Sequence, residues 1–357
     1  MSAAATATGG AGETAHILAV CRTPEDAARL AEAAKEMAPA LAVHTDTASM
    51  PPGSAPVFDA AACAQLLSSG AGAGAGPARV MGRVLLAAGE VGSTQELLRS
   101  HGAALGDGAV AVADRQSSGK GRGGNQWTSP LGCLMFSALR KLRVTSPAQA
   151  PFINYLVCLA VTRGVRRALE GASLPPLDIR IKWPNDIYAS GVKIAGALIH
   201  TTWQGDRFNV ITGIGLNVNN RQPTTCLDAL LEAAAGGGTG AGGPLRPLAR
   251  EAVLAAVLAA MEEVFDTFEA SGFGPLEQEY LASWLHSGQE LDFDDTAPSA
   301  LGAPPSGAPG PRTRLTIRGL SAAGFLLGVD GAGQRYELTP DGNSLDMMQG
   351  LIRRKIM

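Results

Sequence analysis

A glycine-rich segment with two basic side chains is the first part of the sequence that could carry chemistry. Residues 116–127 read Gln-Ser-Ser-Gly-Lys-Gly-Arg-Gly-Gly-Asn-Gln-Trp, which places Lys120 and Arg122 among four glycines. Backbone N–H groups, an ammonium and a guanidinium in such a loop suit phosphate or carboxylate oxygens. A solvated flexible turn explains the same composition equally well, so this segment alone leaves both interpretations open.

Two better-known phosphate loops do not fit this segment. Gly119, Gly121 and Gly124 match the spacing G-x-G-x-x-G, but that fingerprint opens a helix. Residues 125–132 contain Asn, Trp, Pro and Gly, which disfavour a helix, and no acidic residue for a ribose follows a strand about 20 residues on. The NTPase loop is excluded because Lys120 is followed by Gly and not by Ser or Thr.

The second informative segment combines a strand, a hairpin and polar residues between them. Residues 177–183 alternate apolar and polar side chains, which predicts a half-buried strand. Asn185 and Asp186 come just past its end, and a turn at residues 190–191 leads to Lys193 on the next strand.

Small neighbours distinguish Lys193 from an ordinary edge lysine. Ala195 and Ala197 are expected on its own face of the strand, and Gly196 has no side chain at all. Small residues leave room for a ligand and let its atoms approach the backbone. A lone strand lysine is more often a solvated edge residue, but this pattern indicates a ligand site.

Together these segments resemble the biotin–protein ligases, most closely the eukaryotic holocarboxylase synthetases of the plant type. The likeness is carried by G-x-G-R-G-G-N-x-W-x-S-P-x-G, with Lys120 preceding the arginine, over residues 119–132, and by K-W-P-N-D-I-Y followed by K-x-x-G over residues 182–196. Further matches are Gly92–Gln95, Gly213–Asn217, Gln222–Cys226 and Tyr336–Ser344. The likeness covers about residues 80–357.

This resemblance implies an ATP-dependent biotin–[carboxylase carrier protein] ligase. Such an enzyme joins the biotin carboxylate to the α-phosphate of Mg-ATP, giving biotinyl-5′-AMP and pyrophosphate, and a carrier lysine then attacks that mixed anhydride. Two anions meet in the first step, so fixed positive charge is the main requirement. The implied cofactors and substrates are biotin, ATP and Mg²⁺, and the implied partners are the biotin carrier domains of carboxylases.

The resemblance also assigns site residues. The catalytic charges are Lys193, Arg122 and Lys120. The biotin site comprises Ser93, Thr94, Gln95, Gln116, Lys120, Gly121, Arg122, Lys193 and Gly196. The ATP site comprises Arg122, Trp127, Asn185, Asp186, Lys193 and Asn217. Mg²⁺ is expected to enter with ATP, with its protein ligands left open.

Lys120 keeps a positive charge at a position where the family commonly has arginine, but a lysine cannot bind two oxygens at once as the guanidinium of arginine does. Trp127 as a plain core aromatic, and Asp186 as a structural partner of a lysine, remain open interpretations.

Composition supports a globular protein of the cytoplasm. The 29 basic and 32 acidic side chains give a net charge of −3, which offers no electrostatic reason to expect nucleic acid or a membrane as partner. No apolar run approaches the ~20 residues of a membrane-spanning helix. The five scattered cysteines form no C-x-x-C pair, which favours reduced thiols in a reducing compartment; organelle targeting is not excluded.

The chain divides by composition into three blocks. Residues 1–78 are an Ala/Gly-rich extension with a helix starting after Thr23, and the rest of this block is interpreted as linker or weakly ordered. Because it holds no expected site residue, deletion of residues 1–75 is expected to leave adenylate formation intact. Residues 79–286 form the catalytic domain, and residues 287–357 a C-terminal β domain with a flexible insert at 297–311.

By resemblance the fold class is α+β, a class II synthetase-like biotin/lipoate ligase domain. It should have a mixed central sheet with helices on one side, followed by a small SH3-like barrel. Alternatives are a lipoate–protein ligase or octanoyltransferase of the same fold, a biotin-sensing regulator, and a non-catalytic biotin-binding module. The regulator is disfavoured because residues 1–78 contain no basic recognition helix. The carboxylases modified and the oligomeric state are left open.

Overall fold

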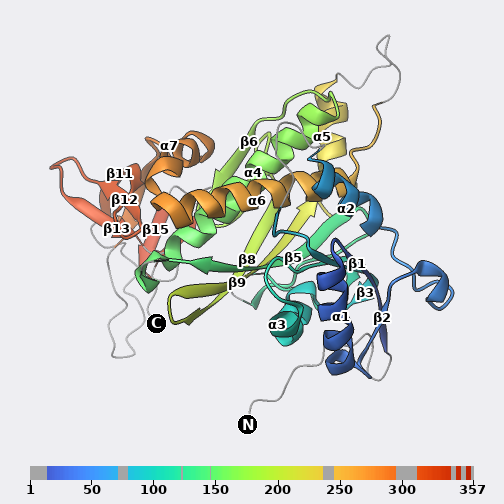
Figure 1. The fold of residues 1–357 in the computed structure, drawn as a ribbon. Helices are drawn as coiled ribbons and strands as arrows, with labels where there is room; N and C mark the ends of the chain where they lie inside the picture. The colour runs from blue at the N-terminus through green and yellow to red at the C-terminus, as the bar shows by residue number, and fades with distance from the viewer. Residues whose placement is uncertain are drawn as a thin grey trace, which may run out of the picture.

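A nine-stranded mixed sheet forms the body of the computed structural model, which describes residues 14–70, 79–121, 124–144, 146–235, 245–294, 312–338, 343–346 and 351–354 (Figure 1). Its strand order is β2-β1-β3-β4-β5-β9-β8-β7-β6. The pairs β1–β2 and β3–β4 are parallel, and all other neighbours are antiparallel. The strands are β1 (Ala15–Cys21), β2 (Leu41–His44), β3 (Val84–Val91), β4 (Val110–Gln116), β5 (Cys133–Arg143), β6 (Ile179–Lys182), β7 (Asp186–Ala189), β8 (Val192–Gln204) and β9 (Arg207–Asn217).

Helices cover both faces of this sheet, whereas the sequence-based expectation placed them on one side. Leu85 and Ala87 of β3 face the core that contains α2 (Ala60–Ser69), α4 (Ala150–Gly171) and α6 (Arg250–Ser271). Val84, Leu86 and Ala88 face the other core, with α1 (Pro24–Met37) and α3 (Thr94–Leu105). Both faces need cover because β3 is apolar on each of its two alternating sides.

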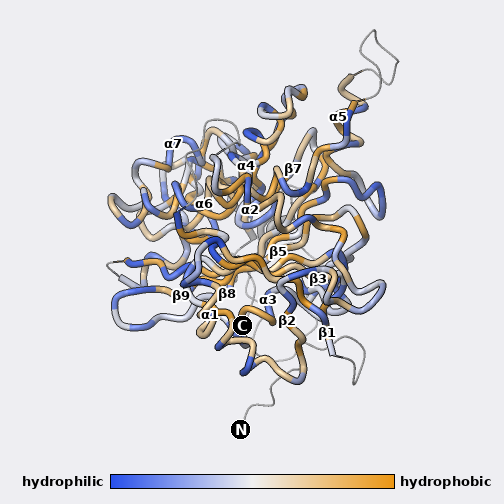
Figure 2. The backbone as a smooth tube through the Cα atoms, turned by 45° about the vertical axis from the view of Figure 1, so that its right-hand side comes forward, coloured by the Kyte–Doolittle hydropathy of each residue, from blue (hydrophilic) through white to orange (hydrophobic). Residues whose placement is uncertain are grey.

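The hydrophobic segments gather where the two helical layers meet the sheet. Figure 2 shows the hydrophobic stretches around β5, in the middle of the molecule. Figure 1 shows α4 and α6 lying side by side across one face, and Gly164 of α4 explains their closeness. A Cβ on Gly164 would lie 2.5 Å from Cα of Val257 in α6. No helix in the described part of the chain has the length and apolarity needed to cross a membrane.

The N-terminal block is built into the sheet over its described residues. The Thr23 side chain accepts from Asp26 N–H and Pro24 begins α1, as the sequence predicted. However, β1 pairs antiparallel with β3, and Ile17 and Leu67 of this block are buried. The linker interpretation is therefore wrong for residues 14–70: their many alanines pack closely, although they look like weak core material in the sequence.

A buried ion pair joins this block to the sheet and to α6. Asp114 of β4 accepts the backbone N–H groups of Val57 and Phe58 and pairs with Arg250 of α6 at 2.8 Å. The Arg250 guanidinium also lies 5.8 Å from the ring centroid of Phe58. Because breaking a buried pair leaves an uncompensated charge, these contacts hold three parts of the chain in one unit.

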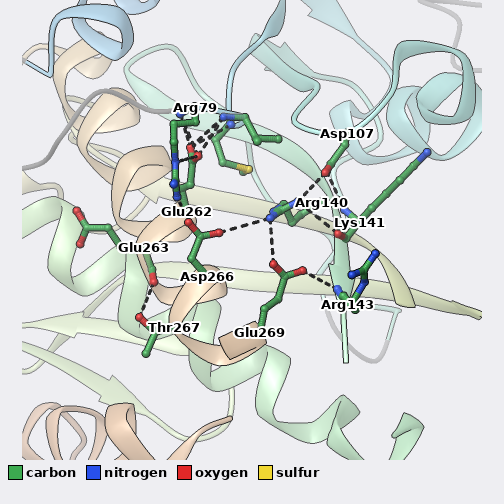
Figure 3. Close-up of polar contacts among 12 residues, drawn as sticks. Arg79, Asp107, Arg140, Lys141, Arg143, Glu262, Glu263, Asp266, Thr267 and Glu269 are labelled. Atoms are coloured by element: carbon green, nitrogen blue, oxygen red, sulfur yellow. Dashed lines mark hydrogen bonds and ion pairs between the residues drawn. The ribbon is translucent and has the colours of Figure 1, made fainter. Parts of the chain in front are cut away.

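Acidic residues of α6 bind the start of the predicted catalytic domain and one end of β5 (Figure 3). The Glu262 carboxylate accepts the backbone N–H groups of residues 79–81. Glu269 accepts from Arg140 Nη2 at 3.4 Å and from the backbone N–H of Arg143 at 2.6 Å. Chain segments far apart in sequence are thereby tied to one helix.

A second, smaller sheet follows α7 (Gly274–Ser283), in the order β13-β12-β11-β10-β15-β14. Only the β10–β15 pair is parallel. Its strands are β10 (Glu290–Asp294), β11 (Arg312–Leu320), β12 (Leu326–Val329), β13 (Arg335–Leu338), β14 (Asn343–Asp346) and β15 (Leu351–Arg354). This agrees with the expected small C-terminal β domain, while the predicted insert 297–311 lies outside the described residues.

Candidate active site

A cavity of about 450 Å³ brings the predicted site residues together. Twelve of them line it: Ser93, Thr94, Gln95, Gln116, Lys120, Gly121, Trp127, Asn185, Asp186, Lys193, Gly196 and Asn217. The thirteenth, Arg122, lies outside the described residues. The cavity is on the α3 side of the sheet, because the lining glycines Gly213 and Gly215 share the alternating face of β9 with Ile211, which is buried in the core that contains α3.

Two paired glycines form the part of the wall on which Trp127 lies. Gly196 of β8 and Gly215 of β9 are cross-strand partners. A Cβ on Gly215 would lie 2.4 Å from Cε2 of Trp127, and one on Gly196 would lie 3.4 Å from Cζ3. The indole therefore lies against bare backbone, a contact that any side chain at position 215 would prevent.

Lys193 faces the cavity because β8 contains a bulge. An extra residue, Ile194, interrupts the pairing of β7 with β8, and a bulge reverses the alternation of the side chains that follow it. Ala195 and Ala197 are consequently in the core on the α4 side. The expectation that they share the face of Lys193 was wrong, and Gly196 is its small neighbour on the cavity side.

An ion pair and an aromatic ring hold the ammonium of Lys193. Its Nζ lies 2.8 Å from Oδ1 of Asp186 and 5.7 Å from the centroid of the Trp127 ring. The side chains of Lys193 and Asp186 are 40% and 22% exposed, so both are open to a ligand. Asn185 bonds to β8 through its side chain: its Nδ2 donates to Ala197 O at 2.9 Å.

Neutral polar groups form another part of the wall. Thr94 donates to Oε1 of Gln116 from its backbone N–H at 2.8 Å and from its hydroxyl at 3.1 Å. The Thr94 hydroxyl also lies 2.8 Å from that of Ser137. Thr94 and Ser137 are both buried. Nothing in the sequence distinguishes Ser137, because a single hydroxyl between Phe136 and Ala138 forms no pattern.

The start of α3 positions two more predicted residues. Ser93 is its N-cap and accepts from the backbone N–H of Glu96 at 3.4 Å. Gln95 reaches across the sheet, where its Nε2 donates to Leu198 O at 2.7 Å. A Cβ on Gly213 would lie 3.3 Å from the Gln95 amide, so glycine makes room for this side chain.

The glycine-rich segment folds back on itself next to the cavity. Trp127 N–H donates to Gly119 O at 3.0 Å, and a Cβ on Gly119 would lie 2.7 Å from Trp127 O. The segment ends at Gly132, whose φ of +89° favours glycine and whose carbonyl accepts from Asn219 N–H at 3.0 Å. Lys120 is exposed on this segment and lines the cavity.

Asn217 and its neighbours close the site at the end of β9. Its Nδ2 donates to the Thr224 hydroxyl at 3.2 Å, and its Oδ1 accepts from Asn220 Nδ2 at 3.0 Å. Thr224 also lines the cavity. It belongs to the Gln222–Cys226 motif noted in the sequence, where it received no role of its own.

The structure also bears on whether a cysteine could act as a nucleophile and on which side chains could hold a metal ion. Burial raises the pKa of Cys133 to about 12, so this thiol is not a nucleophile near neutral pH. Among the described residues, Asp186 is the only carboxylate lining the cavity, and no group of three His, Cys, Asp or Glu side chains is arranged to hold a metal ion. An Mg²⁺ ion here could take Asp186 as a carboxylate ligand, with water or ligand oxygens in its other positions.

Comparison with known proteins identifies the family. The sequence model of the Biotin/lipoate A/B protein ligase family matches residues 91–217. Biotin–protein ligase 1, chloroplastic, from Arabidopsis thaliana is 40% identical over 275 residues, which cover 77% of this chain and 70% of that protein. Biotin–protein ligase 2 from the same organism is 38% identical over 275 residues, covering 77% and 78%. The chain belongs to the biotin–protein ligase family.

A solved biotin–protein ligase shares the fold. The biotin protein ligase from Aquifex aeolicus in complex with biotin and ATP is 26% identical, covers 71% of this chain and 94% of its own, and superimposes with a TM-score of 0.51. In this chain, all cavity-lining residues except Pro223 and Thr224 lie within the family match at 91–217. The cavity is therefore in the part of the chain that the family shares.

Proposed function

We propose that the chain is an ATP-dependent biotin–[carboxylase carrier protein] ligase. The observation that carries this proposal is a single cavity with two kinds of wall. The buried hydroxyls of Thr94 and Ser137 and the half-buried amide of Gln116 suit the ureido head of biotin, and Lys193 suits its carboxylate and a phosphate. A relative of the same fold is titled as a complex with biotin and ATP.

In the first proposed step, a biotin carboxylate oxygen attacks the α-phosphorus of ATP, and the bond to pyrophosphate breaks. Lys193, Lys120 and Arg122 would lower the repulsion between the two anions and stabilise charge on the phosphoryl oxygens. The Lys193 ammonium is already held beside the cavity by Asp186 and Trp127. Little rearrangement of this side chain is then required when the substrates meet.

Nucleotide binding is assigned to the part of the cavity where Trp127 lies against Gly196 and Gly215. Trp127 offers an aromatic face to adenine, and Asn185, Asp186 and Asn217 offer polar contacts. Mg²⁺ would enter on the ATP phosphates with Asp186 as its protein ligand, since Mg²⁺ at nucleotide sites uses one or two carboxylates plus phosphate oxygens; there it would neutralise phosphate charge.

In the second proposed step, the ε-amine of a carrier-domain lysine attacks the acyl carbon of biotinyl-5′-AMP. An amide bond forms, AMP leaves, and the amine loses a proton. Biotin carrier domains of carboxylases are the proposed acceptors. The proposed compartment is the cytoplasm, supported by five free cysteines, as expected where thiols stay reduced.

The polar wall favours biotin over lipoate or octanoate. The buried hydroxyls of Thr94 and Ser137 bond to each other, but their oxygens keep acceptor capacity that the apolar end of either competing acid would cover without satisfying. Buried polar groups left without a partner by a ligand cost binding free energy. The ureido group of biotin has both donors and acceptors to offer.

The decisive experiment incubates the purified chain with Mg-ATP, a carrier domain and one of the three acids. Mass spectrometry should show modification by biotin alone. Lys193→Ala should lower adenylate formation by ~10²–10³-fold, the usual effect of losing one preorganised charge. Lys35→Ala is the matched control, because Lys35 also forms an ion pair, with Glu32 at 2.7 Å, outside the cavity. Equal modification by octanoate, or full activity of Lys193→Ala, would refute the proposal.

A further inference from the structure

Trp183 lies just before the cavity residues Asn185 and Asp186, and both of its N–H groups are held by distant side chains. It is 4% exposed. Its Nε1–H donates to the hydroxyl of Tyr155 at 2.9 Å, and its backbone N–H donates to Nε2 of His286 at 2.9 Å. Tyr155 and His286 are themselves fully buried, so water cannot replace either partner.

Each of these two partners also contacts the C-terminal sheet. The Tyr155 hydroxyl donates to Gly324 O at 2.5 Å, in the turn between β11 and β12. His286 accepts from Trp183 through Nε2, so its Nδ1 carries the proton and donates to Oε1 of Gln289 at 2.8 Å. Gln289 O in turn accepts from Ile317 N–H of β11 at 2.8 Å. Two hydrogen-bond chains thus run from the small sheet to Trp183.

The chain continues directly from Trp183 into the cavity. Pro184 O accepts a weak hydrogen bond from the Cys158 thiol at 3.7 Å. Asn185 exchanges two hydrogen bonds with Ala197 of β8, at 2.9 and 3.0 Å. Asp186 then pairs with Lys193 at 2.8 Å. A shift of Trp183 would therefore move the groups that face the reacting anions.

We propose that Tyr155 and His286 are positioning residues of the adenylation step. By fixing Trp183 against the C-terminal sheet, they set Asn185 and Asp186 relative to Lys193. The C-terminal sheet thereby contributes to catalysis without lining the described cavity. This inference rests on the proposed ligase function, and it adds two residues that touch neither substrate.

Tyr155→Phe tests the inference by removing a single oxygen. The aromatic ring can keep its contacts with Phe152, Phe273 and Tyr280, while Trp183 Nε1–H and Gly324 O lose their partner. Losing a residue that orients a metal ligand commonly costs about 10–100-fold in affinity or activity, and by the same reasoning we expect kcat for adenylate formation to fall about tenfold. The KM for the carrier domain should not change, because Tyr155 is buried and cannot contact a carrier domain.

Tyr280→Phe is a closely matched control. The Tyr280 ring centroid lies 5.0 Å from that of Tyr155. Its hydroxyl is also buried, but it has no hydrogen-bond partner among the described residues. Tyr280→Phe should keep the wild-type kcat. If Tyr155→Phe and Tyr280→Phe had the same kcat and differed only in melting temperature, Tyr155 would be structural and the inference overturned.

His286 is tested by a pair of substitutions. His286→Leu removes the acceptor for Trp183 N–H, whereas His286→Gln keeps a carbonyl oxygen near the place of Nε2. We expect the Leu variant to lose kcat at least as strongly as Tyr155→Phe, and the Gln variant to recover part of it. Equal rates for the two variants would refute the role of His286.

A double variant and the wild type separate the remaining outcomes. Trp183→Phe removes the same hydrogen bond as Tyr155→Phe, so the double variant should be little slower than Trp183→Phe alone. If the kcat losses of the two single variants instead multiplied in the double variant, Tyr155 would act through another contact, contrary to the inference. A wild-type chain that makes no adenylate would overturn both the proposed function and this inference, whereas an active wild type with an unaffected Tyr155→Phe overturns only the inference.

Discussion

At the residue scale, absent side chains shape the cavity as much as charged ones do. The bare backbone of Gly196 and Gly215 lets the Trp127 indole lie against the sheet, where the Lys193 ammonium lies over the ring. An aromatic face near a cation is a favourable arrangement, worth about 0.5–2 kcal/mol depending on desolvation. The position of the lysine is thus linked, through Trp127, to glycines on two different strands.

Gly215→Ala should obstruct this site. The added Cβ would lie 2.4 Å from the indole, so Trp127 must move into the cavity. Overpacking of this kind typically costs about 1–3 kcal/mol, and if that cost falls on binding we expect ATP affinity, measured by calorimetry, to fall about 5- to 150-fold. Gly274→Ala is the control, since nothing lies within 4 Å of its added Cβ. Wild-type ATP affinity in Gly215→Ala would show that Trp127 can lie elsewhere without cost.

Site residues that belong to a sequence motif could be predicted from the sequence, whereas isolated site residues could not. Lys193, Asp186 and Trp127 lie in motifs that can be recognised from the sequence alone. The structure brings these three residues to one cavity. Ser137 lines the same cavity but has only apolar neighbours in its strand. Its position emerges only when β5 pairs with β9 and faces the start of α3.

At the element scale, the segment after α7 joins the two sheets. Leu285 N–H donates to Ile181 O of β6, and Gly288 N–H donates to Ile317 O of β11, each at 2.9 Å. His286 lies between these two bonds and is buried against Trp183. One short connection therefore pairs with both sheets and brings a titratable ring into the interior.

Protonation of His286 should weaken this junction. Burial lowers its pKa; the hydrogen bond to Gln289 opposes this shift and Lys182 adds to it. The unfolded chain, with a histidine pKa of about 6.5, therefore binds more protons than the folded one. The free energy of unfolding should fall as pH drops through about 6.5 and level off below the folded-state pKa. His286→Gln should show a flatter dependence of melting temperature on pH than the wild type.

His101 on α3 sharpens this comparison. Burial lowers its pKa as well, so it adds a slope of the same sign in the wild type. His286→Gln keeps the His101 contribution, and the difference between the two curves reports His286 alone. Parallel curves for wild type and His286→Gln would contradict the prediction.

The start of a helix could be predicted where a capping residue marks it, but the β-bulge in β8 could not be predicted. Thr23 caps α1 as expected, and Ser146 accepts from Ala148 N–H at the turn leading into α4. The bulge at Ile194 reversed the predicted faces of Ala195 and Ala197. One extra residue in a strand leaves no mark in composition, although it decides that Lys193 faces the cavity.

At the scale of the whole molecule, the three compositional blocks share one core. Phe58 and Leu67 from the N-terminal block, Leu156 and Leu258 from α4 and α6, and Ile317 from the small sheet belong to the same buried cluster. Composition suggested separate units because Ala-rich and Gly-rich stretches resemble linkers. Small residues pack as closely as large ones, so their burial depends on partners that are distant in sequence.

Deletion of residues 1–75 should therefore prevent stable folding, contrary to the expectation from sequence alone. It removes β1 from the edge of β3, exposing Leu86 and its neighbours, and it takes the Phe58 N–H away from Asp114. Arg250 and Asp114 would then be open to water on one side. We expect an aggregated product or one without a cooperative melting transition. A soluble truncated chain with wild-type adenylate formation would show instead that the block is an independent unit.

A milder pair of substitutions tests the same idea in an intact chain. Leu67→Ala removes a buried side chain from the shared core and should lower the free energy of unfolding by ~2–5 kcal/mol. Val57→Ala alters the same block at a side chain that is 72% exposed and should change stability by less than ~0.5 kcal/mol. Because the described parts form one unit, Leu67→Ala should lower a single melting transition for the whole chain in calorimetry. A separate early transition, with the main one unshifted, would mean that the N-terminal block unfolds on its own and contributes nothing to the sheet that carries the site.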